Sequence, residues 1–105
     1  MKSLEIKKST IHGKGLFTRI DREKDDAICL AVKRGKTLED THITQLGEWV
    51  NHSELNPNVY LSFCKEGWAL VALRKIYTGE ELVANYRDAP IFIKRPEDYG
   101  GNFKP

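Results

Sequence analysis

Three short stretches of the chain carry residues suited to binding or chemistry. Gly13-Lys14-Gly15 places a charged residue between two glycines, which let a ligand approach the backbone closely. Asn51-His52-Ser53 offers amide, imidazole and hydroxyl groups as hydrogen-bond donors and acceptors. Gly79-Glu80-Glu81-Leu82 is followed four residues later by the phenol of Tyr86. Each stretch alone also has a purely structural explanation, as a tight turn or as a tyrosine packed in the core.

Metal binding and cysteine chemistry are not indicated. Cys29 and Cys64 lie far apart in apolar, strand-like runs and form no C-x-x-C pair, so we expect two buried, reduced thiols. The histidines do not combine with them at the spacing of metal ligands; they are His12, His42 and His52. The sequence therefore predicts no metal site.

The elements that must position these residues are short strands. Period-two alternation or compact apolar runs, bounded by turn-forming residues, predict six strands. They cover Leu4–Lys7, Leu16–Thr18, Ala27–Val32, Val59–Cys64, Trp68–Leu73 and Glu81–Tyr86. Thr37 suits a helix N-cap with Asp40 three residues later, so we expect one short helix or 3-10 turn running toward Leu46. Lys65-Glu66-Gly67 predicts a hairpin loop. Many short strands with one short helical turn predict a mainly β domain.

Length and composition narrow the class of protein. The 105 residues allow one compact domain, and 40% apolar with 30% charged residues is typical of a globular chain. No apolar run approaches the roughly 18 residues of a membrane span, and the N-terminus has no apolar signal-peptide segment. We therefore expect an intracellular, cytoplasmic protein that is not secreted. The net charge is only +2, without a block of like charge, so neither nucleic acid nor a membrane is an expected partner.

The order of the three stretches is more specific than any one of them. A GxG turn near the N-terminus, an Asn-His-Ser turn with a following Pro-Asn, and Gly-Glu-Glu-Leu leading to a tyrosine resemble the SET domain of protein-lysine methyltransferases. The resemblance implies a single SET domain over residues 1–105, with a core at about 6–86. It also implies a β-clip-like fold of several short sheets, whose knot-like threaded C-terminal segment brings Asn51 beside Tyr86. The tail, residues 87–105, is then expected to close the substrate channel or to mediate self-association.

The resemblance also implies the cofactor S-adenosylmethionine and the residues that bind it. These residues are Gly13, Lys14, Gly15, Leu16, Asn51, His52 and Tyr86. The glycines permit close approach of the backbone, and Lys14 can neutralise the methionine carboxylate. Asn51 and His52 are expected to lie under the adenosine and the methionine amine.

Catalysis is assigned by the same resemblance to Tyr86. The implied reaction is an in-line displacement, in which a neutral lysine amine attacks the sulfonium methyl, so the protein must align nitrogen, methyl and sulfur. Phe92 is the candidate aromatic wall of the substrate channel. The implied partner is a lysine in a protein or peptide, such as a histone or another basic protein, and a histone target would place the chain in a host nucleus. The sequence leaves open whether the chain forms a homodimer.

The sequence departs from the family pattern at three points, and two of them, the Asn-His-Ser spacing and the missing Cys-rich segment, motivate an alternative, although the intact GxG, Asn-His and Tyr motifs count against it. Glu54, Leu55 and Asn56 put three residues, rather than two, between Asn-His-Ser and Pro-Asn, which predicts a bulged turn. Lys24-Asp25-Asp26 replaces an expected Lys-Gly turn, and no Cys-rich segment follows the domain. The alternative is a catalytically inactive SET-like module that binds a peptide or a partner. A small β-barrel that binds nucleic acid is a third hypothesis, suggested only by size, strand content and the basic first segment.

Overall fold

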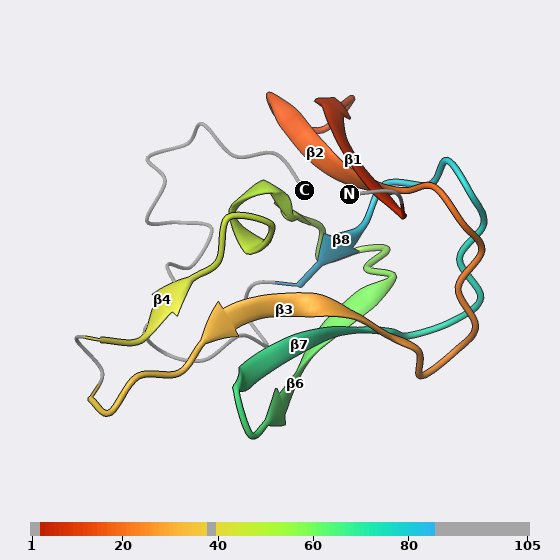
Figure 1. The fold of residues 1–105 in the computed structure, drawn as a ribbon. Helices are drawn as coiled ribbons and strands as arrows, with labels where there is room; N and C mark the ends of the chain where they lie inside the picture. The colour runs from red at the N-terminus through yellow and green to blue at the C-terminus, as the bar shows by residue number, and fades with distance from the viewer. Residues whose placement is uncertain (1–2, 38–39, 86–105) are drawn as a thin grey trace.

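The computed structural model describes residues 3–37 and 40–85, and these residues form two sheets (Figure 1). β1 (Leu4–Lys8) and β2 (Lys14–Thr18) pair as an antiparallel ribbon. The second sheet has six strands in the order β4-β3-β7-β6-β8-β5. Their bounds are β3 Ala27–Lys33, β4 His42–Ile43, β5 Asn51–His52, β6 Val59–Cys64, β7 Gly67–Ala72 and β8 Val83–Ala84. A single 3-10 turn, η1 (Gly47–Trp49), precedes β5, so the described part of the chain is mainly β, as predicted.

The centre of the larger sheet follows directly from the sequence. β6 and β7 are apolar runs joined by the two residues Lys65 and Glu66, and they pair from Val59↔Ala72 to Cys64↔Gly67. β3 adds to the other edge of β7 in antiparallel register. These three strands match their predicted positions to within a residue or two at each end.

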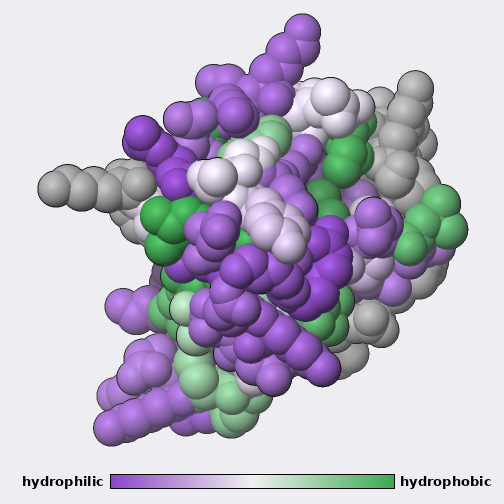
Figure 2. All heavy atoms as spheres, turned by 90° about the vertical axis from the view of Figure 1, so that its right-hand side faces the viewer, coloured by the Kyte–Doolittle hydropathy of each residue, from purple (hydrophilic) through white to green (hydrophobic). Residues whose placement is uncertain are grey.

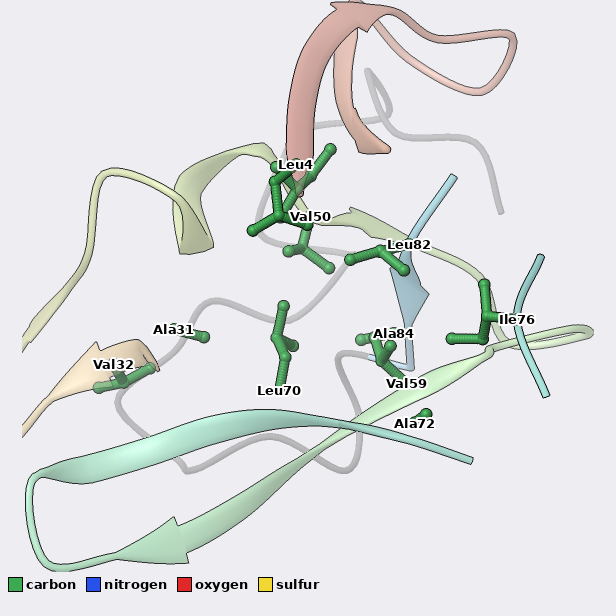
Figure 3. Close-up of a cluster of buried hydrophobic side chains, with 11 residues drawn as sticks. Leu4, Ala31, Val32, Val50, Val59, Leu70, Ala72, Ile76, Leu82 and Ala84 are labelled. Atoms are coloured by element: carbon green, nitrogen blue, oxygen red, sulfur yellow. The ribbon is translucent and has the colours of Figure 1, made fainter. Parts of the chain in front are cut away.

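The hydrophobic core lies between the two sheets, and side chains from both contribute to it (Figure 3). Its most buried large residues are Leu16, Val32, Val59, Leu70, Ile76 and Leu82, each at most 1% exposed. Burial of such side chains stabilises the fold by about 1.5–3 kcal/mol for each. By contrast, the face formed by the connections before β3 and after β7 is largely hydrophilic, with only scattered apolar groups (Figure 2).

Residues 80–84 connect the two sheets. On one side, the amide of Leu82 donates to Leu16 O at 2.7 Å, and the amide of Thr18 donates to Glu80 O at 3.0 Å. On the other side, β8 runs parallel to β5, with the pairs Asn51↔Val83 and His52↔Ala84, and parallel to β6. The start of the segment therefore lies beside β2, and its end lies between β6 and β5. The predicted contact of Asn51 with Tyr86 lies outside the described residues.

Asn58 fixes this segment further. Its side-chain Nδ2 donates to Glu81 O at 2.7 Å, and its Oδ1 accepts a bond from the amide of Val83 at 2.8 Å. Asn58 is only 2% exposed, so both bonds are shielded from water.

Two predicted elements differ from the structure. The helical turn is not at 37–46 but at η1, since Ile43 pairs with Val32 in β4 instead. The Thr37 hydroxyl does accept a weak bond from the amide of Asp40 at 3.4 Å, but the described residues after it do not continue as a helix. The predicted strand at 81–86 is shorter, because the backbone at 81–82 bonds to β2 rather than continuing β8.

The departures from the family pattern are absorbed locally. In the turn after His52, the extra residue bulges outward and leaves Leu55 90% exposed, while Asn51 and His52 stay buried in β5. Asp25 takes a φ of 72° before β3, the left-handed region that usually favours glycine. β5 before the first turn and β3 after the second are both formed. No helix within the described ranges has the length and apolar character needed to cross a membrane.

Candidate cofactor site

The GxG turn needs its two glycines for different reasons. Gly13 has a φ of 47°, and a Cβ there would meet no heavy atom within 4 Å, so this glycine serves the backbone conformation. Gly15 is needed for space. A Cβ at Gly15 would lie 2.1 Å from Glu81 Oε2 and 3.2 Å from Asn51 Nδ2. The turn therefore packs directly against two polar side chains from distant parts of the chain.

Asn51 ties the turn to the larger sheet. Its Nδ2 donates to His12 O at 3.1 Å, to Lys14 O at 3.2 Å and to Glu81 Oε2 at 2.7 Å. Because all three partners are acceptors, the network itself assigns the amide nitrogen to this side. The side-chain oxygen of Asn51 is then left to accept a donor from elsewhere.

Glu81 completes the group. Its carboxylate accepts hydrogen bonds from the Ser9 hydroxyl and from the Asn51 amide. The Ser9 hydroxyl oxygen lies 2.7 Å from Oε1 and 2.9 Å from Oε2. The Ser9 hydroxyl also accepts the backbone amide of Ile11 at 2.9 Å, which anchors the turn. We call this group the acceptor cluster; it consists of Ser9, Asn51, Glu81 and the carbonyls of His12 and Lys14.

Sequence reasoning did not single out Ser9 or Glu81 as site residues. Glu81 belongs to the same Gly-Glu-Glu-Leu stretch that indicated the family, so the motif itself was the available signal. Nothing in the local pattern marks Ser9, which is 72 residues away from Glu81 in the chain.

The other predicted cofactor residues occupy different environments. Leu16 is fully buried, so its side chain belongs to the core, while its carbonyl bonds to the amide of Leu82. Lys14 is exposed on β2. His52 is 1% exposed, and its Nε2 lies 3.6 Å from Glu54 Oε1. Tyr86 and Phe92 lie outside the described residues, as does the tail 87–105.

A pocket of ≈ 270 Å³ adjoins the acceptor cluster on one side. It is lined by Thr10, Ile11, Ser53, Asn56, Asn58, Arg74, Glu80, Glu81 and Val83. Glu81 is the member of the acceptor cluster that reaches it. The remaining lining is mostly polar, which suits a ligand with hydrogen-bonding groups.

Neither metal nor thiol chemistry is supported near this site. Within residues 3–37 and 40–85, no group of three or more His, Cys, Asp or Glu residues could hold a metal ion. Cys29 and Cys64 are free and half-buried. Burial raises the pKa of the Cys29 thiol to about 11, although the charge of Arg22 lowers it slightly. Cys29 is thus a protonated, unreactive thiol at neutral pH.

Comparison with known proteins identifies the family. The family model described as SET domain matches residues 13–87, which is most of the chain. The chain therefore belongs to the SET-domain family, whose members are associated with S-adenosylmethionine-dependent methylation of protein lysines.

The fold agrees with a solved structure. The crystal structure of a Plasmodium falciparum "putative histone methyltransferase" matches with a TM-score of 0.60 and 22% identity, over 82% of this chain and 94% of that one. At this identity the likeness shows the SET fold. No curated protein sequence matches the chain.

Proposed function

We propose that the chain is an S-adenosylmethionine-dependent protein-lysine N-methyltransferase. The observation that carries this proposal is the Asn51 side chain, which bonds at once to the GxG turn and to Glu81. Three motifs that are distant in the sequence thus meet at one place, in a chain of the SET family.

The chemistry of the acceptor cluster fits the amino-acid end of S-adenosylmethionine. The cofactor carries an ammonium group and a sulfonium, and the cluster presents two backbone carbonyls, an amide oxygen and a carboxylate. Oxygen acceptors in a partly buried site favour cationic groups. Gly13-Lys14-Gly15 and Asn51 are therefore the residues proposed to hold this end of the molecule, and the Lys14 ammonium is available to its carboxylate.

When bound, the cofactor supplies an activated methyl group together with its leaving group. The protein therefore has to position and desolvate the reacting groups rather than to create a leaving group. We assign to Tyr86 the alignment of the lysine amine with the methyl and the exclusion of water around it. Asn51 pairs with Val83 across β5 and β8, so Asn51 connects the GxG turn to the strand that precedes Tyr86 in the sequence.

The substrate proposed is a lysine in a basic protein such as a histone. The name of the similar Plasmodium falciparum protein supports this class. Purified protein incubated with labelled S-adenosylmethionine and histones or other basic proteins should transfer label to lysine, as located by mass spectrometry. Label on arginine or on a small molecule would contradict the proposal.

The role of Tyr86 is tested by Tyr86→Phe, which should bind the cofactor but lose most transfer activity. Tyr77→Phe is the matched control, because Tyr77 is 57% exposed and lies outside the site. Equal rates for wild type and Tyr86→Phe would show that the tyrosine is wrongly assigned. If calorimetry at millimolar S-adenosylmethionine finds no binding to the wild type, the chain is instead the inactive peptide-binding module.

A further inference from the structure

We infer that Glu81 is a positioning residue of the cofactor site, whose carboxylate orients Asn51 and whose negative charge favours the cationic end of S-adenosylmethionine. The inference rests on the proposed function and extends it to a residue that the resemblance to the family did not mark. Four observations support it.

The first is that the main chain holds Glu81 from both sides. Its backbone forms a bridge with Phe17 of β2, and the next amide, of Leu82, bonds to Leu16 O. On the opposite side, Asn58 Nδ2 donates to Glu81 O at 2.7 Å. A side chain on so constrained a backbone presents its carboxylate at a defined place.

The second is that the GxG turn leaves room for this carboxylate at Gly15. A Cβ at Gly15 would lie 2.1 Å from Oε2 and 2.7 Å from Cδ of Glu81. Gly15 therefore has no side chain at the point where the carboxylate meets the turn. The position of the Glu81 carboxylate therefore depends on a glycine at position 15.

The third is that the carboxylate orients the Asn51 amide. At 2.7 Å, the bond from Asn51 Nδ2 to Glu81 Oε2 is the shortest of the three that this nitrogen makes. Bonds to a charged acceptor are stronger than bonds to a neutral carbonyl. Glu81 thus directs Nδ2 inward and keeps Asn51 Oδ1 available as an acceptor.

The fourth is that the charge of Glu81 is not neutralised within the described residues. Its side-chain partners, Ser9 and Asn51, are neutral, and it forms no ion pair there. Glu80, one residue earlier, is different, because it pairs with Arg74 at 3.2 Å. Within the described residues, the Glu81 carboxylate therefore lacks the cationic partner that Glu80 has.

Calorimetry with two ligands separates orientation and charge from a general structural role. S-adenosylmethionine carries the cationic end, and methylthioadenosine has the same nucleoside without the amino-acid group or the sulfonium. Glu81→Gln keeps the size and some hydrogen bonding but removes the charge. We expect it to weaken S-adenosylmethionine binding by about tenfold and methylthioadenosine binding by less than about twofold.

Glu66→Gln, in the exposed loop between β6 and β7, is the matched control, and we expect it to change the affinity for either ligand by less than about twofold. In ligand-free protein, NMR spectra should show the side-chain amide signal of Asn51 shifted in Glu81→Gln and unchanged in Glu66→Gln. This measurement does not depend on activity or on the cofactor.

Equal weakening of both ligands by Glu81→Gln, or no weakening, would overturn the inference while the proposed function stands. Absence of binding to the wild type would overturn both. If Glu81→Gln does not fold, Ser9→Ala removes one donor from the carboxylate and leaves its charge. Ser9→Ala should then weaken S-adenosylmethionine alone by about twofold to fivefold, and unchanged affinity would overturn the inference.

Discussion

The acceptor cluster and the β3-β7-β6 part of the larger sheet are held together by different means. In the sheet, β6 and β7 pair without a register shift and are joined by a two-residue loop, and β3 pairs with β7 across two register shifts. The cluster instead joins residues 72 positions apart, as between Ser9 and Glu81, and 30 apart, as between Asn51 and Glu81. The sheet buries apolar surface, whereas the cluster satisfies buried polar groups.

This difference indicates which substitutions each region tolerates. Apolar burial is non-directional and roughly proportional to area, so volume is the quantity that the sheet must keep. Hydrogen bonds between buried groups depend on position and partner type, so the cluster must keep geometry and donor–acceptor matching. Substitutions in the sheet should reduce stability alone, while substitutions in the cluster should also change ligand binding.

The largest expected effect is in the sheet. Leu70 of β7 is 1% exposed, and Leu70→Ala leaves a cavity, so we expect the free energy of unfolding to fall by about 2–5 kcal/mol. Leu73→Ala is the control, since Leu73 is 40% exposed and should cost less than about 1 kcal/mol. Denaturant unfolding measures both. A cost below that of Leu73→Ala would show that β7 is not central to the core.

The next effect is in the cluster. Gly15→Ala forces a Cβ into the Glu81 carboxylate, and we expect a loss of about 3 kcal/mol. Gly13→Ala meets open space and only strains a positive φ, at about 1 kcal/mol. In a Glu81→Ala background the cost of Gly15→Ala should shrink, and that of Gly13→Ala should not. Equal costs in both backgrounds would mean that Gly15 and Glu81 do not contact each other.

A charge placed in the cluster should have a smaller, pH-dependent effect. Asn51→Asp replaces the donor 2.7 Å from Glu81 by a second carboxylate, and we expect a loss of about 2 kcal/mol at neutral pH. Repulsion makes the folded variant bind a proton more readily than the unfolded chain does, so its stability should recover as pH falls. Asn51→Ala lacks this repulsion, and its deficit relative to wild type should not shrink on acidification. Thermal unfolding between pH 5 and pH 8 distinguishes the two.

The smallest effect tests whether β3 behaves as an apolar region. Because burial raises the pKa of Cys29 from 9.0 to about 11, the folded protein keeps this proton at pH values where the unfolded chain loses it. Stability should therefore fall as pH rises from 9 to 11, by about 1 kcal/mol after allowance for partial exposure. Cys29→Ala should remove this part of the pH dependence. Identical slopes for variant and wild type would place the thiol in a solvated environment.

Much of the strand pattern could be predicted from the sequence, because alternation and turn residues are local properties. The strands at Val59–Cys64 and Ala27–Lys33 follow apolar runs that fit no long helix. The sequence predicts the helical turn too early in the chain. A capped turn at Thr37 competes with the pairing of Ile43 and Val32, and the outcome depends on a partner strand that the local sequence does not contain.

The site was predicted through motif order rather than through contacts. Gly13-Lys14-Gly15 and Asn51 do meet, but the reason, a shared amide nitrogen, is a tertiary fact. Leu16 stays a predicted cofactor residue; its side chain is in the core, so a contact with the cofactor would have to come from its backbone.

The sequence by itself determined the family, the mainly β content and the turn before β2, since each depends on residue types at short spacing or in a fixed order. Only the tertiary structure decided that Glu81 meets Ser9 and Asn51, and that Gly13 and Gly15 have different tasks. The physical reason is that the position of this partly buried carboxylate depends on the groups that donate hydrogen bonds to it. Those partners come from chain segments that only the packing of residues 80–84 between β2 and β5 brings together.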